Sequence, residues 1–584
     1  MKINGIAIFL LIIAIAATQF TPFAYAYNPP PVKWNKTYGG SRPDMAYFVQ
    51  QANDNGYVIT GYTSSFGAGS TDFWLVKTDW NGNIQWNKTY GGTSQDKAYS
   101  VEQTNDEGYI LAGSTTSFGA GFSDFWLVKT DSNGEQIWNK TYGGSRLDDA
   151  YSVQQTIDGG YIAAGSTNSF GSGYKDFWLV KTDPNGEMQW NKTYGGIYDD
   201  IAYSVQQIAD GYIVCGYTGS FGAGYEDFWL VKTDSNGNAV WNKTYGGENS
   251  DYAYFVQQTS DNGYILAGST YSSSTEFDIW LVKTDSSGNM QWNKTYGGSL
   301  DEEAYTVRQT SDGGYIITGF TDSFSDNRDI WIIKTDSSGN VEWSQTYGGT
   351  REDEAYAVQQ TSDGGYIIAG TTYSFGPSWD PNFWLIRLAG LHDIGVQNVV
   401  PHKTVVGKGY SVFINITFKN WGQSEETFDF TVYANTTNIG TQHLTLAEGN
   451  SITVTFTWNT SGFAKGNYTI SAYAEPVMGE TDTEDNRKED GWVVVAVPGD
   501  FVGQGYPIYA PPDGKVDFND QMCFVDAFFA KYGIPPPPGV NPANCDLTGQ
   551  GYPPLSAPDG TITLDDQMCF VDAFFAQYGI TPPW

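Results

Sequence analysis

Two short acidic stretches near the C-terminal end carry the residue types best suited to chemistry. The stretch "DGKVDFNDQMCFVDAFFAKYG" from Asp513 returns as "DGTITLDDQMCFVDAFFAQYG" from Asp559. Clustered carboxylates repel one another unless a cation offsets their charge, and the hard Ca²⁺ ion prefers several oxygen ligands. The pattern predicts calcium binding in this part of the chain, with about two ions, one for each copy. A solvated acidic turn before a helix is the alternative.

The spacing of these residues follows the register of an EF-hand calcium loop. Asp513 takes loop position 5, Gly514 the sharp turn at position 6, and Lys515 supplies the carbonyl at position 7. An insertion after the first ligand, of equal length in both copies, leaves position 3 without an assignable residue. The candidate metal ligands are Asp500, Asp513, Lys515, Asp517 and Asp520 in the first copy, and Asp546, Asp559, Thr561, Thr563 and Asp566 in the second.

Two loop–helix units in tandem resemble a dockerin. The resemblance implies a small α-helical module over residues 498–584 that binds a cohesin-like or other scaffold or cell-surface protein. The partner-facing positions would be Phe518, Asn519, Leu564 and Asp565. These differ from the Ser/Thr pairs common in the family, so the identity of the partner is left open.

The four cysteines suggest no catalytic or zinc site. Cys523, Cys545 and Cys569 fall in the same module, where one disulfide of undetermined pairing is compatible with the sequence. Cys215 replaces Ala or Thr of its sister repeats and is expected to be a buried small apolar residue.

Residues 27–390 are poor in catalytic residue types. All three histidines, His392, His402 and His443, come after this region. Paired carboxylates could hydrolyse glycosides, but one Asp precedes nearly every "FW" or "IW", which favours a repeated turn device. The copies are Asp72, Asp124, Asp176, Asp227, Asp278 and Asp329.

Asn-x-Ser/Thr patterns occur in two settings. Four lie after residue 390 and are candidate glycosylation sites: Asn415, Asn435, Asn459 and Asn467. Six lie in the repeated "WNKTYGG", where modification and a plain strand with an outward polar face are equally good interpretations: Asn35, Asn87, Asn139, Asn191, Asn242 and Asn293.

That heptad marks an internal repeat of about fifty residues. It begins at Trp34, Trp86, Trp138, Trp190, Trp241 and Trp292, with the variant "WSQTYGG" at Trp343. Each unit runs "AYSVQQT", "GYIIAG", "FWLVKTD", an Asn-Gly or Ser-Gly turn, and the heptad. These are short β-branched and aromatic runs between turn signals, so four strands per unit are predicted.

Seven four-stranded units predict a seven-bladed β-propeller over residues 27–390. The last unit lacks its heptad, and the heptad at Trp34 lacks a unit. We therefore expect this N-terminal strand to pair with Phe383–Leu388 and close the propeller, and deletion of residues 27–40 to open it. The repeats resemble secreted propellers with "DGGY…G" and "W…K…G…W" patterns, and the resemblance implies that the repeated Trp side chains pack against neighbouring blades.

Residues 391–497 change to alternating apolar and polar positions with frequent turns, as in an immunoglobulin-like β-sandwich. The segments "DIGVQNV", "FKNWGQ", "TVTFTWNT" and "GNYTISAYAEP" resemble the cell-adhesion-related (CARDB) domain of secreted bacterial and archaeal proteins. The resemblance implies an extracellular spacer or adhesion module without catalysis.

The first 26 residues match a secretory signal peptide that ends in "AYA" at Ala24–Ala26, so export is predicted, with no membrane span after cleavage. An uncleaved membrane anchor is the alternative, although the apolar run is short for a bilayer span. Asp and Glu number 65 against 30 Lys and Arg, a formal charge of −35. This balance argues against nucleic-acid binding, which needs a basic footprint.

The expected fold class is mainly β: a propeller closed by an N-terminal strand, a sandwich and a helical dockerin-like module. The expected function is that of a secreted, non-enzymatic binding or adhesion protein, attached to a scaffold through calcium-ordered loops. The alternatives are an extracellular polysaccharide-degrading hydrolase or lyase and a lectin-like protein that binds an extracellular glycan.

Overall fold

The computed structural model describes residues 29–272, 276–377, 379–390, 392–422, 424–477, 480, 483 and 485–496. These residues form 36 strands, β1 to β36, and no helix. The predicted signal peptide and the predicted calcium-binding region lie outside the described residues.

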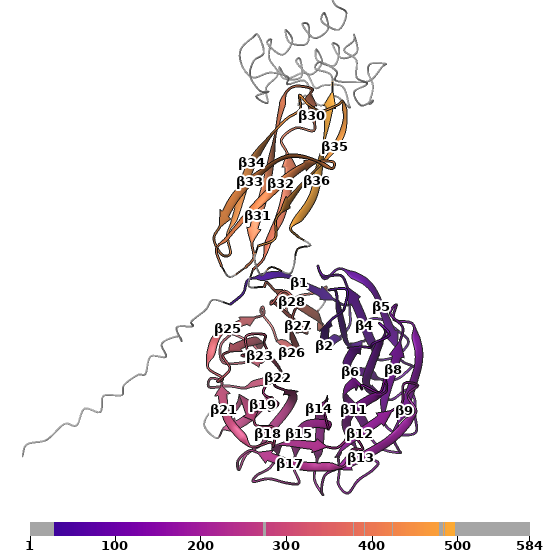
Figure 1. The fold of residues 1–584 in the computed structure, drawn as a ribbon. Helices are drawn as coiled ribbons and strands as arrows, with labels where there is room; N and C mark the ends of the chain where they lie inside the picture. Colours follow the sequence, from indigo (N-terminus) through magenta and orange to yellow (C-terminus); the bar gives the residue numbers. More distant parts are fainter. Residues whose placement is uncertain are drawn as a thin grey trace, which may run out of the picture.

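Residues 32–388 form seven antiparallel sheets of four strands each, arranged about a common centre (Figure 1). The innermost strands are β2 (Asp44–Gln51), β6 (Asp96–Gln103), β10 (Asp148–Gln155), β14 (Asp200–Ile208), β18 (Asp251–Gln258), β22 (Glu302–Gln309) and β26 (Asp353–Gln360). The second strands are β3 (Tyr57–Thr63), β7 (Tyr109–Thr115), β11 (Tyr161–Thr167), β15 (Gly211–Thr218), β19 (Tyr264–Ser272), β23 (Tyr315–Thr321) and β27 (Tyr366–Thr372).

The outer half of each sheet completes the repeat. The third strands are β4 (Asp72–Thr78), β8 (Asp124–Thr130), β12 (Asp176–Thr182), β16 (Asp227–Thr233), β20 (Glu276–Thr284), β24 (Asp329–Thr335) and β28 (Asn382–Leu388). The fourth strands are β5 (Ile84–Tyr90), β9 (Gln136–Tyr142), β13 (Met188–Tyr194), β17 (Ala239–Tyr245), β21 (Met290–Tyr296), β25 (Val341–Tyr347) and, for the last sheet, β1 (Val32–Tyr38).

The N-terminal strand joins the last sheet. Strand β1 pairs antiparallel with β28, with Tyr38 opposite Phe383 and Trp34 opposite Arg387. The predicted pairing of the Trp34 heptad with Phe383–Leu388 is confirmed. The two ends of the repeat region are thus held by backbone hydrogen bonds of one sheet.

The predicted fold class as a whole is wrong and needs correction. The described residues build many small separate sheets, and strand-to-strand hydrogen bonding stops at the edges of each four-stranded sheet. No closed propeller and no helical dockerin-like module is seen in this part of the chain. The sequence pattern reports four strands per repeat, but it carries no information on how separate sheets associate. We therefore describe residues 29–390 as the seven-sheet unit.

Aromatic side chains pack between neighbouring sheets of this unit. Trp74 lies 4.5 Å from Phe383, and Trp126 lies 4.5 Å from Phe73, measured between ring centroids. The outer Trp34 contacts Tyr57 of the next sheet at 5.8 Å. The expectation that the repeated Trp residues pack against neighbours is confirmed, and Cys215 is fully buried as expected.

The tight turn between the third and fourth strands fixes a further contact between sheets. Gly82 has a φ of 72°, and a Cβ there would lie 2.7 Å from the Trp34 ring, so the predicted Asn-Gly turn requires glycine for conformation and for space. Tyr38 of the preceding sheet donates a hydrogen bond of 2.7 Å to the Gly82 carbonyl. The heptad tyrosine and the turn glycine therefore work as a pair.

Residues 394–496 form two sheets over one core. One has the order β29 (Ile394–Pro401), β31 (Ser411–Asn420), β34 (Ser451–Asn459). The other has the order β30 (Val405–Gly407), β36 (Arg487–Ala496), β35 (Gly466–Ala474), β32 (Glu426–Ala434), β33 (Thr437–Leu446). Alternating residues of β31, such as Ile414 and Phe418, face Phe430 and its neighbours from the opposite sheet. The alternation read from the sequence is the pattern of such a two-sheet core.

A buried lysine joins the two parts of the chain. Lys33 of β1 lies 3.0 Å from Asp393 and 3.2 Å from Asp485, and its side chain is only 5% exposed. Next to it, Ala389 N–H donates to the Pro31 carbonyl over 3.0 Å. Strand β1 therefore contacts both the last sheet of the seven-sheet unit and the following domain (Figure 1).

Deleting residues 27–40 should destabilise the full chain strongly, because β28 loses its partner and presents an open sheet edge. We expect a loss of more than about 4 kcal/mol in the free energy of unfolding, measured by denaturant titration. Asn35→Ala is the control, since it removes only the acceptor of the Trp384 indole. Equal stability of the deleted and intact chains would contradict a locking role for β1.

Lys33→Met should cost about 3–5 kcal/mol, because it leaves the buried Asp393 carboxylate without its cation. The measurement is calorimetric unfolding of the full chain. Lys36→Met in the same strand, where the side chain is exposed, should change the transition little. If both variants melt alike, the junction does not depend on Lys33.

Candidate functional site

A cycle of seven tyrosines lies at the centre of the seven-sheet unit. Each comes from the "AYxVQQ" strand of one repeat, and neighbouring ring centroids are 4.9–5.2 Å apart all the way round. Burial raises the pKa of these hydroxyls well above the ordinary value, as at Tyr151 and Tyr305, so they stay neutral. The members are Tyr47, Tyr99, Tyr151, Tyr203, Tyr254, Tyr305 and Tyr356.

Three residues further along these strands, amide side chains connect neighbouring sheets. The side-chain oxygen of Gln359 accepts the backbone N–H of Gln51 over 2.7 Å, and that of Gln50 accepts the N–H of Gln103 over 2.7 Å. The same bond recurs from Gln207 to Gln154, from Gln258 to Gln206 and from Gln309 to Gln257, at 2.6–2.7 Å. Strand edges carry backbone N–H groups that need an acceptor, and this position supplies one.

Two of the seven repeats depart from glutamine at this position. Glu102 keeps the role of acceptor, because its carboxylate receives the Gln155 N–H. Arg308 cannot do so, since a guanidinium has donors only. Its plane lies over the Phe255 ring, with 4.5 Å from Cζ to the ring centroid. Its Nε is buried without a hydrogen-bond partner among the described residues.

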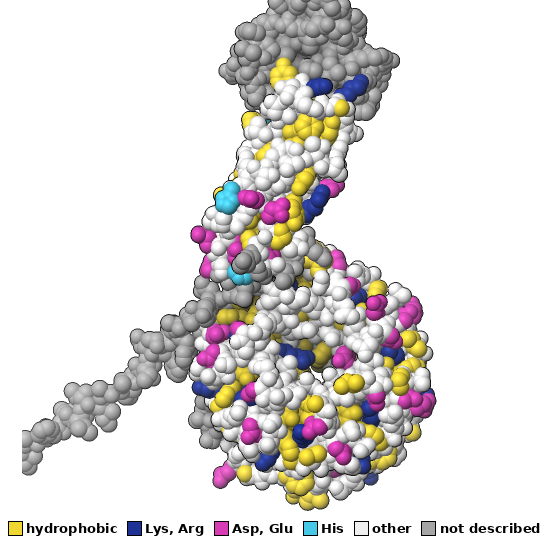
Figure 2. Space-filling view, in the orientation of Figure 1, with side chains coloured by type: hydrophobic (Ala, Val, Ile, Leu, Met, Phe, Trp, Pro, Cys, Tyr) yellow, Lys and Arg dark blue, Asp and Glu magenta, His cyan; other side chains and the backbone are white. Residues whose placement is uncertain are grey.

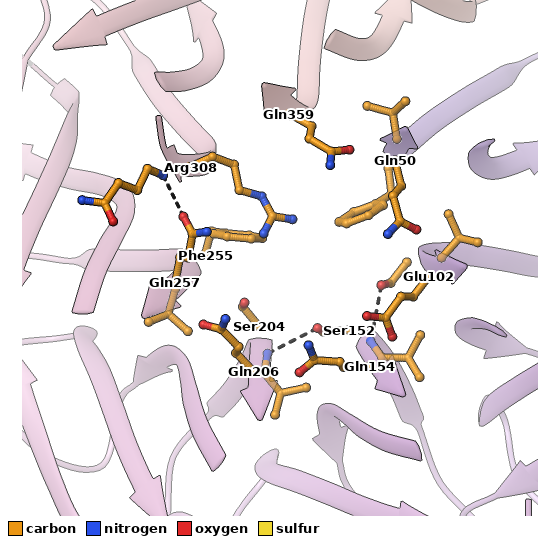
Figure 3. A pocket seen from close by; sticks show the side chains of 18 of the residues that line it. Gln50, Glu102, Ser152, Gln154, Ser204, Gln206, Phe255, Gln257, Arg308 and Gln359 are labelled. Atoms are coloured by element: carbon orange, nitrogen blue, oxygen red, sulfur yellow. Dashed lines mark hydrogen bonds between the residues drawn. The ribbon is translucent and has the colours of Figure 1, made fainter. Parts of the chain in front are cut away.

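These side chains enclose a pocket of ≈ 370 Å³ (Figure 3). Glu102 comes from β6 and Arg308 from β22, so they lie on opposite walls, with amides and the hydroxyls of Ser152 and Ser204 between them. A second cavity of ≈ 220 Å³, lined by the tyrosine cycle, shares several of these residues. The volume of the first is within the roughly 300–1,000 Å³ range of small-molecule sites.

Burial shifts the pKa values of both charged groups. Burial raises the pKa of Glu102 to about 7, and the bond from Gln155 N–H and the charge of Arg308 offset this only in part. Burial lowers the pKa of Arg308 to about 10, against the opposing effect of Glu102. At neutral pH the arginine is therefore cationic, whereas the glutamate lies close to its midpoint.

The chemistry of the wall is hydrogen bonding. The residues that line the pocket include amides, serines, one carboxylate and one guanidinium, but no His, Cys or Lys. This set can orient a polar ligand by donors and acceptors, with one charged group of each sign. It contains no nucleophile beside a base of the kind that covalent catalysis requires.

None of the site residues singled out from the sequence lines this pocket. The predicted metal ligands and partner-binding residues, Asp500 to Asp566, lie outside the described residues. Within the described chain, no group of three or more His, Cys, Asp or Glu side chains is arranged to hold a metal ion. The candidate glycosylation sites Asn415, Asn435, Asn459 and Asn467 are exposed on the second domain.

The repeated polar residues have structural roles. Asp72 accepts the Gly69 N–H over 2.9 Å, and Asp124 accepts the Gly121 N–H over 3.0 Å, so the interpretation as a turn device is confirmed for these copies. The sequon residue Asn87 accepts the Trp74 indole N–H over 3.3 Å, and it is also exposed. Both interpretations of the heptad sequons thus remain compatible with the structure.

Sequence reasoning missed Glu102 and Arg308. The available signal was the change of "VQQ" to "VEQ" and "VRQ" in two repeats. Aligned repeats would have found it, but only the structure shows that both positions face one pocket.

A second exposed feature lies on the loops between the second and third strands. Four aromatic side chains there are largely solvent-exposed: Phe122 (77%), Tyr174 (71%), Tyr225 (72%) and Trp379 (82%). On the visible face of the seven-sheet unit, apolar and acidic side chains are interspersed, with fewer basic ones (Figure 2).

Comparison with known proteins identifies the second domain. The family model CARDB matches residues 391–490, so a CARDB domain is found there. The domain of a Pyrococcus furiosus protein, solved as a CARDB domain in complex with di-metal ions, is 22% identical and covers 18% of this chain and 96% of its own, with a TM-score of 0.16.

Two other matches carry no functional argument. The regulatory protein FlaEY of Caulobacter vibrioides is 24% identical over 131 residues, which are 20% of this chain and 13% of that protein. A solved eukaryotic initiation factor is 9% identical, with coverage of 80% of this chain and 92% of its own and a TM-score of 0.25. Among the described residues, none forms a helix with the length and hydropathy needed to cross a membrane.

Glu102→Gln should remove part of the pH dependence of stability. The folded-state pKa of Glu102 is raised from 4.5 to about 7, so its contribution is present below about pH 4.5 and is lost as pH rises through 7. Relative to wild type, the variant should gain on the order of 2 kcal/mol between pH 4.5 and 8. Urea titration at both pH values measures this. The exposed Glu107→Gln is the control, and a parallel pH profile in wild type and Glu102→Gln would refute the assignment.

Proposed function

We propose that this protein is an extracellular, non-catalytic binding and adhesion protein whose seven-sheet unit presents a ligand site. One observation carries the proposal: at the glutamine position of the central pocket wall, two repeats carry ionisable side chains instead, Glu102 and Arg308. A residue present in every repeat serves the architecture, whereas a specific ligand requires asymmetry. The pocket supplies that asymmetry without a nucleophile–base pair.

The CARDB domain supports the setting of this proposal. It suggests an adhesion-related extracellular domain, and the buried Lys33 contacts hold it directly against the seven-sheet unit. Such a domain would act as a spacer between the binding unit and whatever holds the chain.

Two further parts of the proposal, export and attachment to a partner, rest on the sequence alone. The N-terminal 26 residues supply the secretion signal. The acidic loops around Asp513 and Asp559 bind Ca²⁺ and order a surface that attaches to a scaffold or cell-surface partner, because closely spaced carboxylates need a cation to offset their repulsion.

Glycan binding is a second candidate for the seven-sheet unit. The observation in its favour is the set of exposed aromatic rings Phe122, Tyr174 and Tyr225 on loops of consecutive repeats. Exposed apolar groups gathered on one face mark interaction sites, and flat rings offer a stacking surface to sugars.

Incubating the full chain with a panel of extracellular polysaccharides should give retention without release of reducing ends. Reducing-end or unsaturated products would replace the binding function with hydrolysis or elimination. For the glycan candidate, the triple change Phe122→Ala, Tyr174→Ala and Tyr225→Ala should weaken retention roughly tenfold or more. Ile157→Ala, an 89% exposed residue in the opposite set of turns, should not.

Calcium should raise the melting temperature of the full chain, and a chelator should lower it again, because an ion that binds only the folded state stabilises it. Differential scanning calorimetry checks this, with Mg²⁺ as the comparison ion. The double variant Asp513→Ala and Asp559→Ala should no longer respond to Ca²⁺. An unchanged transition in wild type on chelation would end the calcium proposal.

A further inference from the structure

The junction between β22 and β26 differs chemically from the other junctions around the pocket. At five of them a glutamine oxygen accepts the N–H of the next sheet, and at a sixth Glu102 does so. At the seventh, Arg308 stands where the acceptor would be. Gln360 N–H therefore receives no acceptor from this position, because a guanidinium has donors only. The guanidinium lies instead against Phe255 of β18, the neighbour on the other side of β22.

No described side chain accepts a hydrogen bond from Gln360 N–H or from the Arg308 guanidinium. The ion pairs of the described residues include none with Arg308 within 4 Å, and its Nε has no hydrogen-bond partner. Phe255 lies against the guanidinium plane and leaves its edge for a further contact. A planar guanidinium with a free edge suits a carboxylate, which accepts two parallel bonds.

The opposite wall offers the complementary group. Glu102 accepts the Gln155 N–H, and a carboxylate has further lone pairs for donors. It does not reach Arg308, since no bond or ion pair between the two is found among the described residues. A molecule lying across the pocket would meet a donor-rich end at Arg308 and an acceptor at Glu102.

We propose that the pocket binds a small organic carboxylate, with its carboxylate on Arg308 and its hydroxyl or ammonium donors toward Glu102 and the wall amides. This inference rests on the proposed binding function and names the ligand class of the same pocket. Sugar acids and amino acids both carry the carboxylate for Arg308. They differ in the group that would donate to Glu102, which is a hydroxyl in a sugar acid and an ammonium in an amino acid.

Isothermal titration of the full chain tests the proposal with two matched pairs of probes: D-glucuronate against D-glucose, and 4-aminobutanoate against butylamine. At least one carboxylate should bind, and its match, which carries a hydroxymethyl or methyl group in place of the carboxylate, should bind roughly tenfold or more weakly. Glu102→Gln should weaken 4-aminobutanoate but leave glucuronate nearly unchanged, which separates the two sources.

Arg308→Gln is the decisive variant. It restores the residue found in five other repeats, so it should fold, and it should weaken the carboxylate roughly tenfold or more. Arg308→Lys keeps the charge without the fork and should retain part of the affinity. The exposed Arg146→Gln changes the net charge equally and should leave binding intact.

Failure of both carboxylates to bind, or equal binding by wild type and Arg308→Gln, would overturn the carboxylate proposal. Retention on the polysaccharide panel tests the proposed binding function separately from the carboxylate proposal. If the full chain and Arg308→Gln both remain attached to the polysaccharide panel without a carboxylate effect, the binding function stands and this ligand class is wrong. If nothing is retained and no carboxylate binds, both are wrong.

Discussion

The seven-sheet unit depends on how each small sheet satisfies the N–H groups of its innermost edge. Strand-to-strand hydrogen bonding ends at that edge, and a buried edge without acceptors would be costly. The repeated glutamine supplies a side-chain oxygen to the next sheet, as Gln359 does for Gln51 across the two ends of the repeat region. Two further sets of contacts pack the same junctions between sheets: the tyrosine cycle on the innermost strands and the Trp–Phe pairs on the third strands.

Most residues that hold the sheets together are different from those that give the central pocket its ionisable groups. The residues that recur in all or nearly all repeats, such as the heptad tyrosine, the turn glycine and the Asp before "FW", are occupied by bonds within or between sheets. They have little capacity left for a ligand. Arg308 is the position where the repeat loses one link between sheets, whereas Glu102 keeps its link to Gln155.

Strand β1 connects the second domain to this unit. Strand β1 completes the last sheet through β28 and carries Lys33 to Asp393 and Asp485 of the CARDB domain. A buried cation shared by two carboxylates ties the domain junction to the integrity of the last sheet. The central pocket and the CARDB domain are therefore parts of one connected structure.

The sequence by itself determined the elements: four strands per repeat, the Asn-Gly turns, the pairing of the Trp34 heptad with Phe383–Leu388 and the CARDB domain. These follow from local alternation, turn chemistry and repeat count, which are written along the chain. It misjudged the overall fold class, since strand patterns do not state how separate sheets associate. It also could not place Glu102 opposite Arg308, because these residues are far apart in sequence and face one pocket only when the seven sheets stand about a common centre. Tertiary structure alone decided the site, since a pocket is a property of side chains from many strands.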